Sequence, residues 1–571
     1  MNKILLSLVA FFTFSLSIAQ DLPKYLTEDE KAMMPAYIQQ AKLGNITTPP
    51  SSPVRAMAEW EELDGLLVTW TSYTTIIREI VKYARQETQV YIVCADSNAV
   101  KSNLTSNSIP LSNIHYLVAP FNSVWSRDYG QWNVYTNDID SLLIVDWIYN
   151  RPRPKDDTIP KVLADHLNLP FYEMTTPPYD LIHTGGNYMV DGFGTAFSSN
   201  LVVDENPTKS IADIDTIMKH FMGIDRYIKM TVLPYDDIHH IDMHLKLLDE
   251  ETLLVGEFPA GVSDGPQIEA NLLYILNNFN SVYGTPYKIV RIPMPPSTAG
   301  AYAPNTSYRT YANSVFINKT ILVPTYYPQY DTTAIRIYKE ALPGYNVIGI
   351  NANGMISAGG ALHCITKEIG AADPLLISHK ALPNTFDVIN PYQVDARIQH
   401  RSGISTAGIY YRTDTLQPYQ PAAMSLTNVQ DNIWTAYIPA QPVGSVVYYY
   451  VEANSNSGKA QVRPLPAPAG FWKFEVLPIV SMNEIGLMEF KPVFPNPSKG
   501  ITAIPVSSNK ATELKITLND LLGRKVKDIF EGTVPVGDSY YFINTTDTSS
   551  GVYLIKFESE SNMQTQKLVV R

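Results

Sequence analysis

The chain has 571 residues, more than one hydrophobic core usually spans, so two or three domains are expected. A composition of 45% hydrophobic and 17% charged residues is typical of a globular protein and excludes a disordered or coiled-coil chain. The net charge of −12, without a run rich in lysine and arginine, argues against nucleic acid or an anionic membrane as a partner and favours a small cationic ligand.

The N-terminal residues 1–19 predict a secretory signal peptide. Lys3 precedes the apolar run 4–14, and Ser17-Ile18-Ala19 places small residues three and one positions before the expected cut. An anchored helix is the alternative, but the run is shorter than the ~20 residues that a membrane span needs. Residues 20–52 are polar and contain prolines, so we expect a pro-segment that is trimmed or loosely ordered.

Residues 53–372 alternate between strand-like and helix-like segments. Short apolar runs typical of buried strands occupy 65–70, 90–95, 142–149, 253–258 and 347–350. Apolar residues at helical spacing predict helices over 77–84 and 268–276. Asn318-Lys319-Thr320 lies between two apolar runs and predicts the turn of a hairpin. We therefore expect one large α/β domain built from several similar units.

The helical pattern ends near Leu382-Pro383-Asn384. Residues 376–480 contain short strand-like segments between Pro, Gly and Asn clusters, which predicts a β-sandwich of seven or so strands. Residues 487–571 also alternate as strands do. Four motifs in this last part resemble the C-terminal sorting domain of proteins that the Bacteroidetes type IX secretion system exports: Phe494-Pro495-Asn496-Pro497, Asp520-Leu521-Leu522-Gly523-Arg524, Gly551-Val552-Tyr553 and Lys567-Leu568-Val569-Val570. A further adhesive β-sandwich is the alternative.

The chain has two cysteines, Cys94 and Cys364. In an exported protein a disulfide between them is one interpretation. Cys94 ends the apolar run Tyr91-Ile92-Val93-Cys94 and is more simply a small buried hydrophobe. Cys364 has polar and glycine-rich flanks, which suits an accessible thiol, and a thiolate is a strong nucleophile. Its neighbour His363 points to the opposite face if this stretch is extended, so we give it no role.

His240-Ile241-Asp242 places an imidazole and a carboxylate on the same side of the chain if the segment is an extended strand. The histidine could then move protons while the aspartate contacts a cation. A metal site is the alternative, because four ligand types cluster here, His239, His240, Asp242 and His244. That alternative leaves Cys364 without a role, and no second cluster with zinc-like spacing accompanies it.

Asp128 is the second carboxylate of interest, in the segment that begins at Trp125. It is either a turn residue paired with Arg127 or a ligand for a substrate cation. Attack on a guanidinium carbon requires a sulfur nucleophile, a proton carrier and paired anions. One thiol, one imidazole and two carboxylates meet that requirement.

The motifs W-x-R-D-Y-G, N-R-P-R-P, H-x-D, Y-x-N-S and G-G-x-L-H-C follow one another in this order. Together they resemble the agmatine deiminase and peptidylarginine deiminase branch of the guanidine-modifying superfamily, and most closely its Porphyromonas-type members. The resemblance implies an α/β pentein propeller of five ββαβ units around a central pocket. It also implies a layout of signal peptide 1–19, pro-segment 20–52, catalytic domain 53–372, immunoglobulin-like domain 376–480 and sorting domain 487–571.

The resemblance also implies roles for individual residues. Cys364 would be the nucleophile, His240 the general acid and base, and Asp128 with Asp242 the clamps on the guanidinium. Asn313, in Tyr311-Ala312-Asn313-Ser314, matches the active-site asparagine of the family. Trp125 would wall the pocket and Ile238 would contact the substrate. Neither a metal nor another cofactor is expected, because these side chains supply the chemistry.

Arg151 and Arg153 bear on the choice of substrate. Two arginines at i and i+2 in an extended segment can both direct their guanidinium N–H groups at one carboxylate. In Porphyromonas-type relatives the matching pair receives the carboxylate of a C-terminal arginine, whereas the alternative here is a salt bridge to Asp156 or Asp157. The stretch 235–239, which includes Ile238, carries two additional acids that could alter this preference.

The expected function is hydrolysis of arginine, preferentially at peptide C-termini, to citrulline and ammonia through a thiouronium on Cys364. Expected partners are such peptides or proteins, or small guanidines, and the type IX machinery, but not nucleic acid. The protein would be secreted, or attached to the outer membrane at the cell surface after export through the periplasm. The alternatives are a secreted agmatine deiminase, a cysteine peptidase and a non-enzymatic surface adhesin.

Overall fold

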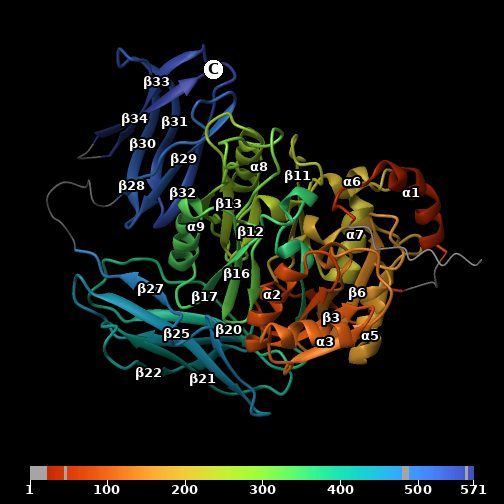
Figure 1. Ribbon diagram of the computed structural model, residues 1–571. Helices are drawn as coiled ribbons and strands as arrows, with labels where there is room; N and C mark the ends of the chain where they lie inside the picture. The colour runs from red at the N-terminus through yellow and green to blue at the C-terminus, as the bar shows by residue number, and fades with distance from the viewer. Residues whose placement is uncertain (1–21, 44–47, 479–487, 560–562) are drawn as a thin grey trace, which may run out of the picture.

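The computed structural model describes residues 22–43, 48–478, 488–559 and 563–571. The expected signal peptide lies outside these ranges. Figure 1 shows an α/β body, coloured red to green, with one β module below it and a second β module at its upper left. None of the helices in the described ranges combines the length and the apolar character that crossing a membrane requires.

Residues 54–370, all of which the structure describes, form five separate sheets. Each contains an antiparallel strand pair followed by a helix and a strand parallel to the second of the pair. A parallel neighbour requires such a crossover, because the chain must return to the end of the sheet from which it started. The alternation of strand-like and helix-like segments is therefore confirmed.

The chain passes through these sheets in order. The first complete unit is β5 (Trp132–Thr136), β6 (Leu142–Tyr149), α5 (Ile159–Leu167) and β7 (Phe171–Met174), extended by β1 (Val54–Ala56) and β8 (Ile182–His183). The second unit is β9 (Met189–Val190), β10 (Thr195–Ser199), α6 (Leu201–Asp204), α7 (Ile211–Met222) and β11 (Arg226–Met230). The third unit is β12 (Leu245–Leu247), β13 (Thr252–Glu257), α8 (Gly265–Asn278) and β14 (Lys288–Pro293). The fourth is β15 (Val315–Ile317), β16 (Thr320–Thr325), α9 (Pro328–Ala341) and β17 (Asn346–Asn351), which contains the predicted hairpin.

The remaining sheet joins the two ends of the domain. Strand β18 (Lys367–Gly370) pairs antiparallel with β2 (Leu63–Thr69), and β2 runs parallel to β3 (Gln89–Cys94) after α2 (Thr74–Glu87). Helix α3 (Ser97–Ser106) and β4 (Ile114–Val118) extend this sheet on its other side. The pairing brings the segment that carries Cys364 back to the start of the domain.

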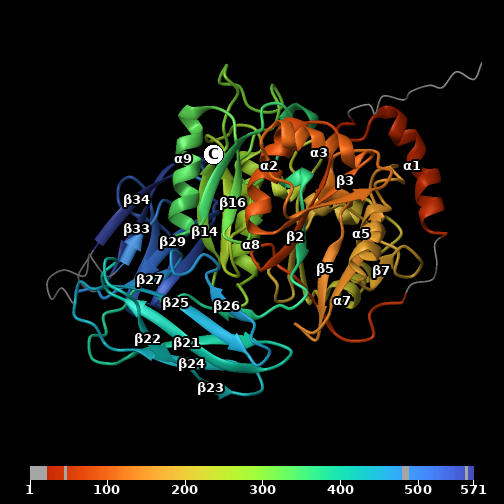
Figure 2. The same ribbon diagram turned by 60° about the horizontal axis from the view of Figure 1, so that its bottom comes forward.

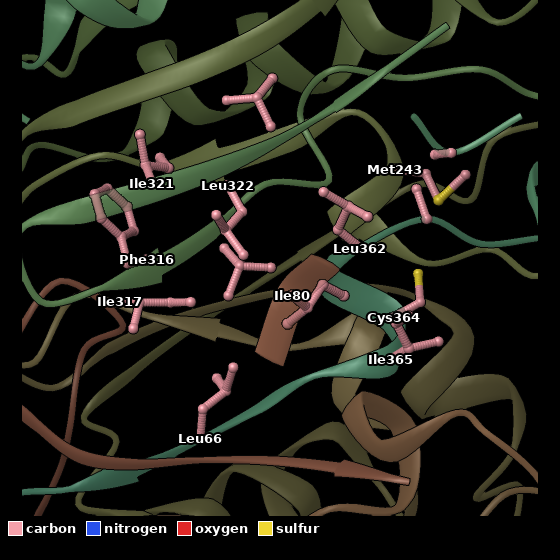
Figure 3. Close-up of a cluster of buried hydrophobic side chains, with 14 of the residues drawn as sticks. Leu66, Ile80, Met243, Phe316, Ile317, Ile321, Leu322, Leu362, Cys364 and Ile365 are labelled. Atoms are coloured by element: carbon pink, nitrogen blue, oxygen red, sulfur yellow. The ribbon is translucent and has the colours of Figure 1, made fainter. Parts of the chain in front are cut away.

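Cys364 lies at the edge of the largest apolar cluster of the domain (Figure 3). Its chain neighbours Leu362 and Ile365 are fully buried in that cluster, together with Met243 from a different unit. Burying one such side chain contributes about 1.5–3 kcal/mol. The segment carrying the thiol is therefore held by core packing on both sides.

Residues 22–43, here called the N-terminal segment, are ordered against the α/β body, whereas we expected residues 20–52 to be a trimmed or loosely ordered pro-segment. Helix α1 (Glu28–Ala41) begins with a capping box, in which Thr27 and Glu30 satisfy each other's backbone amides. Tyr37 packs in a small apolar cluster with Ile148 and Ile182. Side-chain burial and the helix cap therefore fix residues 27–41. The burial of Tyr37 depends on tertiary contacts, whereas Thr27-Glu28-Asp29-Glu30 is a local signature of a helix start.

Residues 376–476 form two facing sheets with a common apolar core, seen below the α/β body in Figure 2. Their strands are β19 (Leu376–His379), β20 (Tyr392–Gln399), β21 (Ile404–Arg412), β22 (Gln420–Ala423), β23 (Ser425–Asn428), β24 (Ile433–Ile438), β25 (Val446–Ser455), β26 (Ala460–Arg463) and β27 (Trp472–Glu475). Lys459 pairs with Glu62 at 2.7 Å, and Arg463 donates to the Trp60 carbonyl at 2.9 Å. These contacts join the module to the α/β body.

The C-terminal module also consists of two sheets around its own core. Its strands are β28 (Met488–Phe490), β29 (Ile501–Ser508), β30 (Thr512–Asn519), β31 (Lys525–Val534), β32 (Gly537–Asn544), β33 (Gly551–Glu558) and β34 (Met563–Val570). Strands β29 and β32 lie against α8 of the α/β body. The Arg291 guanidinium lies 4.9 Å from the centre of the Phe494 ring across this contact.

Candidate active site

A single 3-10 turn, His363–Ile365, presents Cys364. Its sulfur accepts hydrogen bonds from the Nδ2 of Asn313 at 3.2 Å and from the Nζ of Lys24 at 2.9 Å. Gly360 makes room for it, since a Cβ there would lie 2.9 Å from the sulfur and 2.7 Å from the Trp125 ring. Cys364 and Cys94 are both buried free thiols, so the interpretation of a disulfide is wrong.

His240 and Asp242 do not lie on a strand, and the expectation of an extended H-x-D pair is wrong. His240 precedes a 3-10 turn, Ile241–Met243, that contains Asp242. The backbone amide of His240 donates to Asp236 at 3.1 Å, which fixes the entry to the turn. Burial, followed by the positive charge of Lys24, lowers the pKa of His240 well below its ordinary value. The imidazole is therefore neutral and able to accept a proton.

Asp128 lies in the short helix α4 (Ser126–Tyr129), 3.5 Å from the Nδ1 of His240. Its Oδ1 accepts a hydrogen bond from the backbone amide of Gly186 at 3.2 Å. The alternative of a pair with Arg127 is wrong, because Arg127 forms its ion pairs with Glu59 at 3.2 Å and Glu368 at 2.8 Å. Asp128 thus turns toward the thiol and the imidazole rather than toward its chain neighbour.

His363 and Glu59 also belong to the site, although the sequence analysis assigns no role to either. The ring of His363 forms two hydrogen bonds with carboxylates. Its Nδ1 lies 2.9 Å from Asp242 Oδ2, and its Nε2 lies 2.7 Å from Glu59 Oε1. The expectation that His363 points away is wrong, because the chain forms a 3-10 turn here instead of an extended strand. No motif surrounds Glu59, so no local signal could have revealed it.

The charges around Asp242 decide its protonation. Burial would raise its pKa, but Lys24 and then His363 lower it well below the ordinary value. The same balance holds for Glu59, where burial is outweighed by His363, Lys246 and Arg127. Asp242 is therefore an ionised carboxylate in a buried pocket, as a clamp for a cation must be.

Asn313 connects the parts of the site. Its Nδ2 contacts the sulfur of Cys364 and donates to the Asp242 carbonyl at 3.3 Å, while its Oδ1 accepts from the His363 amide at 3.0 Å. The structure thus brings together Cys364, His240, Asp128, Asp242 and Asn313. All five are at most 1% exposed.

Lys24 is a further site residue that the sequence does not predict. Its ammonium lies 3.7 Å from Asp128 and 3.8 Å from Asp242, and the residue is fully buried. Burial lowers its pKa, but the charges of Asp128, Asp242 and Cys364 raise it more, so the ammonium stays charged. Burial and Asp242 together raise the pKa of Cys364 to about 12 although Lys24 opposes them, so the thiol is protonated in this state.

The predicted substrate-binding residues surround the backbone next to Lys24. Arg151 Nε donates to the Lys24 carbonyl at 3.0 Å, Arg153 Nη2 to the Pro23 carbonyl at 2.7 Å, and Trp125 Nε1 to the Leu22 carbonyl at 2.8 Å. Arg153 forms its ion pair with Glu30, at 2.7 Å, rather than with Asp156 or Asp157.

Ile238 is buried beside Gly359, where a Cβ would lie 3.7 Å from its Cγ2 and 3.3 Å from the Lys24 Cβ. In the described ranges no group of three or more His, Cys, Asp or Glu side chains has an arrangement that could hold a metal ion.

The family model for Porphyromonas-type peptidyl-arginine deiminases matches residues 55–369, which is more than half of the chain. The chain belongs to this family. It is thus a guanidine-modifying deiminase of the agmatine and peptidylarginine deiminase group. A second family model, the secretion system C-terminal sorting domain, matches residues 492–571. The deiminase is therefore exported, to the cell surface or beyond it.

Individual relatives agree with this assignment. A Legionella pneumophila protein provisionally named an agmatine deiminase is 26% identical over 268 residues, covering 45% of this chain and 75% of the relative. A Mycoplasma mycoides protein with the same provisional name is 22% identical over 363 residues, or 56% of this chain and 97% of its own. The crystal structure of a Porphyromonas gingivalis protein provisionally named an arginine deiminase shares the fold, with a TM-score of 0.50. The two chains are 21% identical, and the match covers 56% of this chain and 99% of that one.

Proposed function

We propose that this deiminase hydrolyses the guanidinium of arginine to citrulline and ammonia through a covalent thiouronium on Cys364, with peptides that end in arginine as preferred substrates. One observation carries the proposal. A thiol, a neutral imidazole and two carboxylates converge around a buried cation, with Asp128 and Asp242 both within 4 Å of the Lys24 ammonium. We also propose that the five units surround this pocket as a pentein propeller, and that residues 376–480 are an immunoglobulin-like domain.

The chemistry follows from these groups. Asp128 and Asp242 hold the planar cation by charge-assisted hydrogen bonds. A cation in the pocket lowers the pKa of the Cys364 thiol, whose proton passes to His240 as the sulfur adds to the guanidino carbon. His240 returns that proton to the nitrogen that leaves as ammonia. It then deprotonates a water that attacks the thiouronium, which releases citrulline and the free thiol. General acid–base help of this kind is worth about 10²–10⁴-fold.

The preference for a C-terminal arginine is supported by Arg151 and Arg153, both at most 5% exposed. Their donors point at main-chain carbonyl oxygens of the segment that fills the pocket. A C-terminal arginine would place a carboxylate at the Arg151 contact, and a charged acceptor strengthens such a bond roughly twofold. Agmatine has no carboxylate and would leave this buried guanidinium without its acceptor.

A secreted agmatine deiminase is the second candidate, because the Legionella and Mycoplasma relatives carry that provisional name. Arg151 distinguishes the two substrates. Arg151→Ala should damage conversion of a peptide ending in arginine and leave conversion of agmatine intact.

The test is citrulline or carbamoylputrescine formation by the full chain carrying Lys24→Ala and Glu30→Gln, because Lys24 fills the pocket and Glu30 holds its segment on Arg153. We expect activity on the peptide, none after addition of Cys364→Ala, and a loss of about 100-fold with Arg151→Ala, equivalent to about 2.7 kcal/mol for a charge-assisted bond. Arg336→Ala, at an exposed arginine, is the matched control. Faster conversion of agmatine than of the peptide would refute the proposed preference.

A further inference from the structure

Lys24 occupies the pocket in the manner of a substrate side chain. Counted from Cβ, the Nζ of lysine is the fifth atom, and the fifth atom of arginine is the guanidino carbon. The Lys24 Nζ lies 2.9 Å from the Cys364 sulfur. An arginine in the same pose would therefore place its reacting carbon at about the 3–3.5 Å separation of a near-attack geometry.

The carboxylates fit the same substitution. Asp128 and Asp242 lie 3.7 and 3.8 Å from the Lys24 Nζ, which is longer than a direct hydrogen bond. The two terminal nitrogens of a guanidinium lie about 1.3 Å beyond its central carbon. They would close this gap on both sides. The pocket thus has the size of a guanidinium. Lys24 supplies the positive charge of a guanidinium but lacks its two terminal nitrogens.

The main chain around Lys24 is held at each residue. Trp125, Arg153 and Arg151 donate to three successive carbonyl groups, those of residues 22, 23 and 24. The Lys24 amide itself donates to the Ala358 carbonyl at 2.9 Å. These contacts recognise backbone and not side chains, so they would accept many peptide sequences that precede an arginine.

Glu30 completes the match. Its carboxylate forms a two-pronged contact with Arg153, at 2.7 Å to Nε and 3.2 Å to Nη2, and α1 holds it in place through the Thr27 capping box. The N-terminal segment therefore supplies this arginine with an anion as well as the pocket with a cation.

We propose that residues 22–30 are an internal substrate mimic, which keeps the unprocessed chain latent and reveals that the enzyme binds arginine on an extended peptide backbone. The inference rests on the function proposed above. Lysine suits this role because its ammonium has no carbon to which the thiol can add. Removal of the segment frees the pocket, both arginines and Trp125 together, and an incoming peptide takes the same contacts.

The test uses the full chain with Lys24→Ala, Lys24→Arg and, as matched control, Lys31→Ala at a lysine of the same segment that is 55% exposed. The first readout is alkylation of Cys364 by iodoacetamide, followed by peptide mass spectrometry that separates it from Cys94. We expect alkylation of Lys24→Ala at least roughly tenfold faster than of wild type, because the buried sulfur loses the group that covers it. Lys31→Ala should behave as wild type.

The second readout is the residue at position 24 in Lys24→Arg. We expect conversion of this arginine to citrulline, with one water consumed and one ammonia released, at a rate independent of protein concentration. Equal alkylation of Cys364 in wild type and Lys24→Ala would overturn the mimic. Arginine that persists at position 24, while the same protein converts an added peptide, would overturn it too and leave the proposed function standing. Fast alkylation of Lys24→Ala without conversion of any guanidine would instead refute the function and retain the occupied pocket.

Discussion

Glu59→Gln tests whether the buried charges behind the site hold it together. Glu59 lies 2.7 Å from the Nζ of Lys246, 2.7 Å from His363 and 3.2 Å from Arg127, and these three partners are each 1% exposed. Arg127 keeps Glu368 at 2.8 Å after the substitution. In the part of the chain that the structure describes, Lys246 then keeps the Phe316 ring, 5.4 Å from its Nζ, and has no second ion pair. The substitution therefore leaves one buried ammonium without an anion.

The cost of such a change is about 3–5 kcal/mol. At roughly 2 °C per kcal/mol for a domain of this size, the calorimetric transition of the α/β domain should fall by about 6–10 °C. Glu340→Gln is the matched control, because Glu340 pairs with Arg336 at 2.9 Å on an exposed helix face where both side chains are 61% exposed. An exposed pair of this kind contributes about 0.3–0.5 kcal/mol, so that transition should shift by about 1 °C or less.

A double variant decides the cause. Glu59→Gln with Lys246→Met removes both members of the pair, and it should recover a large part of the lost stability, because replacing a buried pair by apolar groups is often neutral. A loss no larger than that of the exposed control would refute the reasoning. A double variant as unstable as the sum of the two single variants would refute it equally.

Three further predictions concern other parts of the deiminase. In the chain that carries Lys24→Ala, Gly186→Ala should lower kcat about 100-fold, since a Cβ there would overlap the Nδ1 of His240 and displace the imidazole; unchanged kcat would contradict this. Burial lowers the pKa of Lys367 to about 7 from 10.5 although its ion pair with Glu368 at 2.7 Å opposes this, so wild-type stability should rise with pH through this range. The stability of Lys367→Met relative to wild type should therefore be higher at about pH 6 than at about pH 9, and an equal difference at the two pH values would contradict this. Burial would raise the pKa of Glu30, but the hydrogen bond from Arg153 lowers this pKa below 4.5. The stabilisation of α1 by the Glu30–Arg153 pair is therefore complete above pH 4.5 and weakens as the pH falls. Amides of α1 should therefore exchange hydrogen faster in Glu30→Gln than in wild type at about pH 7, and the difference should shrink as the pH falls below 4.5.

The sequence predicted those parts of the fold that local patterns encode. Residues 142–149 were expected as a strand and form β6 with the same bounds, and the turn at 318–320 separates two strands that pair as a hairpin. Apolar periodicity reports burial directly, which is why these predictions were confirmed. The family resemblance covered the same region as the matching family model, residues 55–369.

The site was predictable in its membership and less so in its local conformation. The spacing predicts extended chain at His240, Asp242 and His363, whereas each lies in or beside a 3-10 turn. Such short turns leave no periodic signal, because one turn contains too few residues to show a period. Glu59 and Lys24 were missed for a different reason. Both reach the site only through tertiary contacts, Lys24 across 340 residues of chain.

The pairing of β18 with β2 sets the order in which the molecule can be completed. Lys367 pairs with Leu67, so the sheet that begins the domain lacks an edge strand until nearly all of the domain has left the ribosome. Cys364 directly precedes that strand, and its position is therefore fixed among the last. Pairing between such distant segments is slow, because a large loop must close before the contacts form. The surroundings of the reactive sulfur are therefore completed only when the two ends of the domain have met.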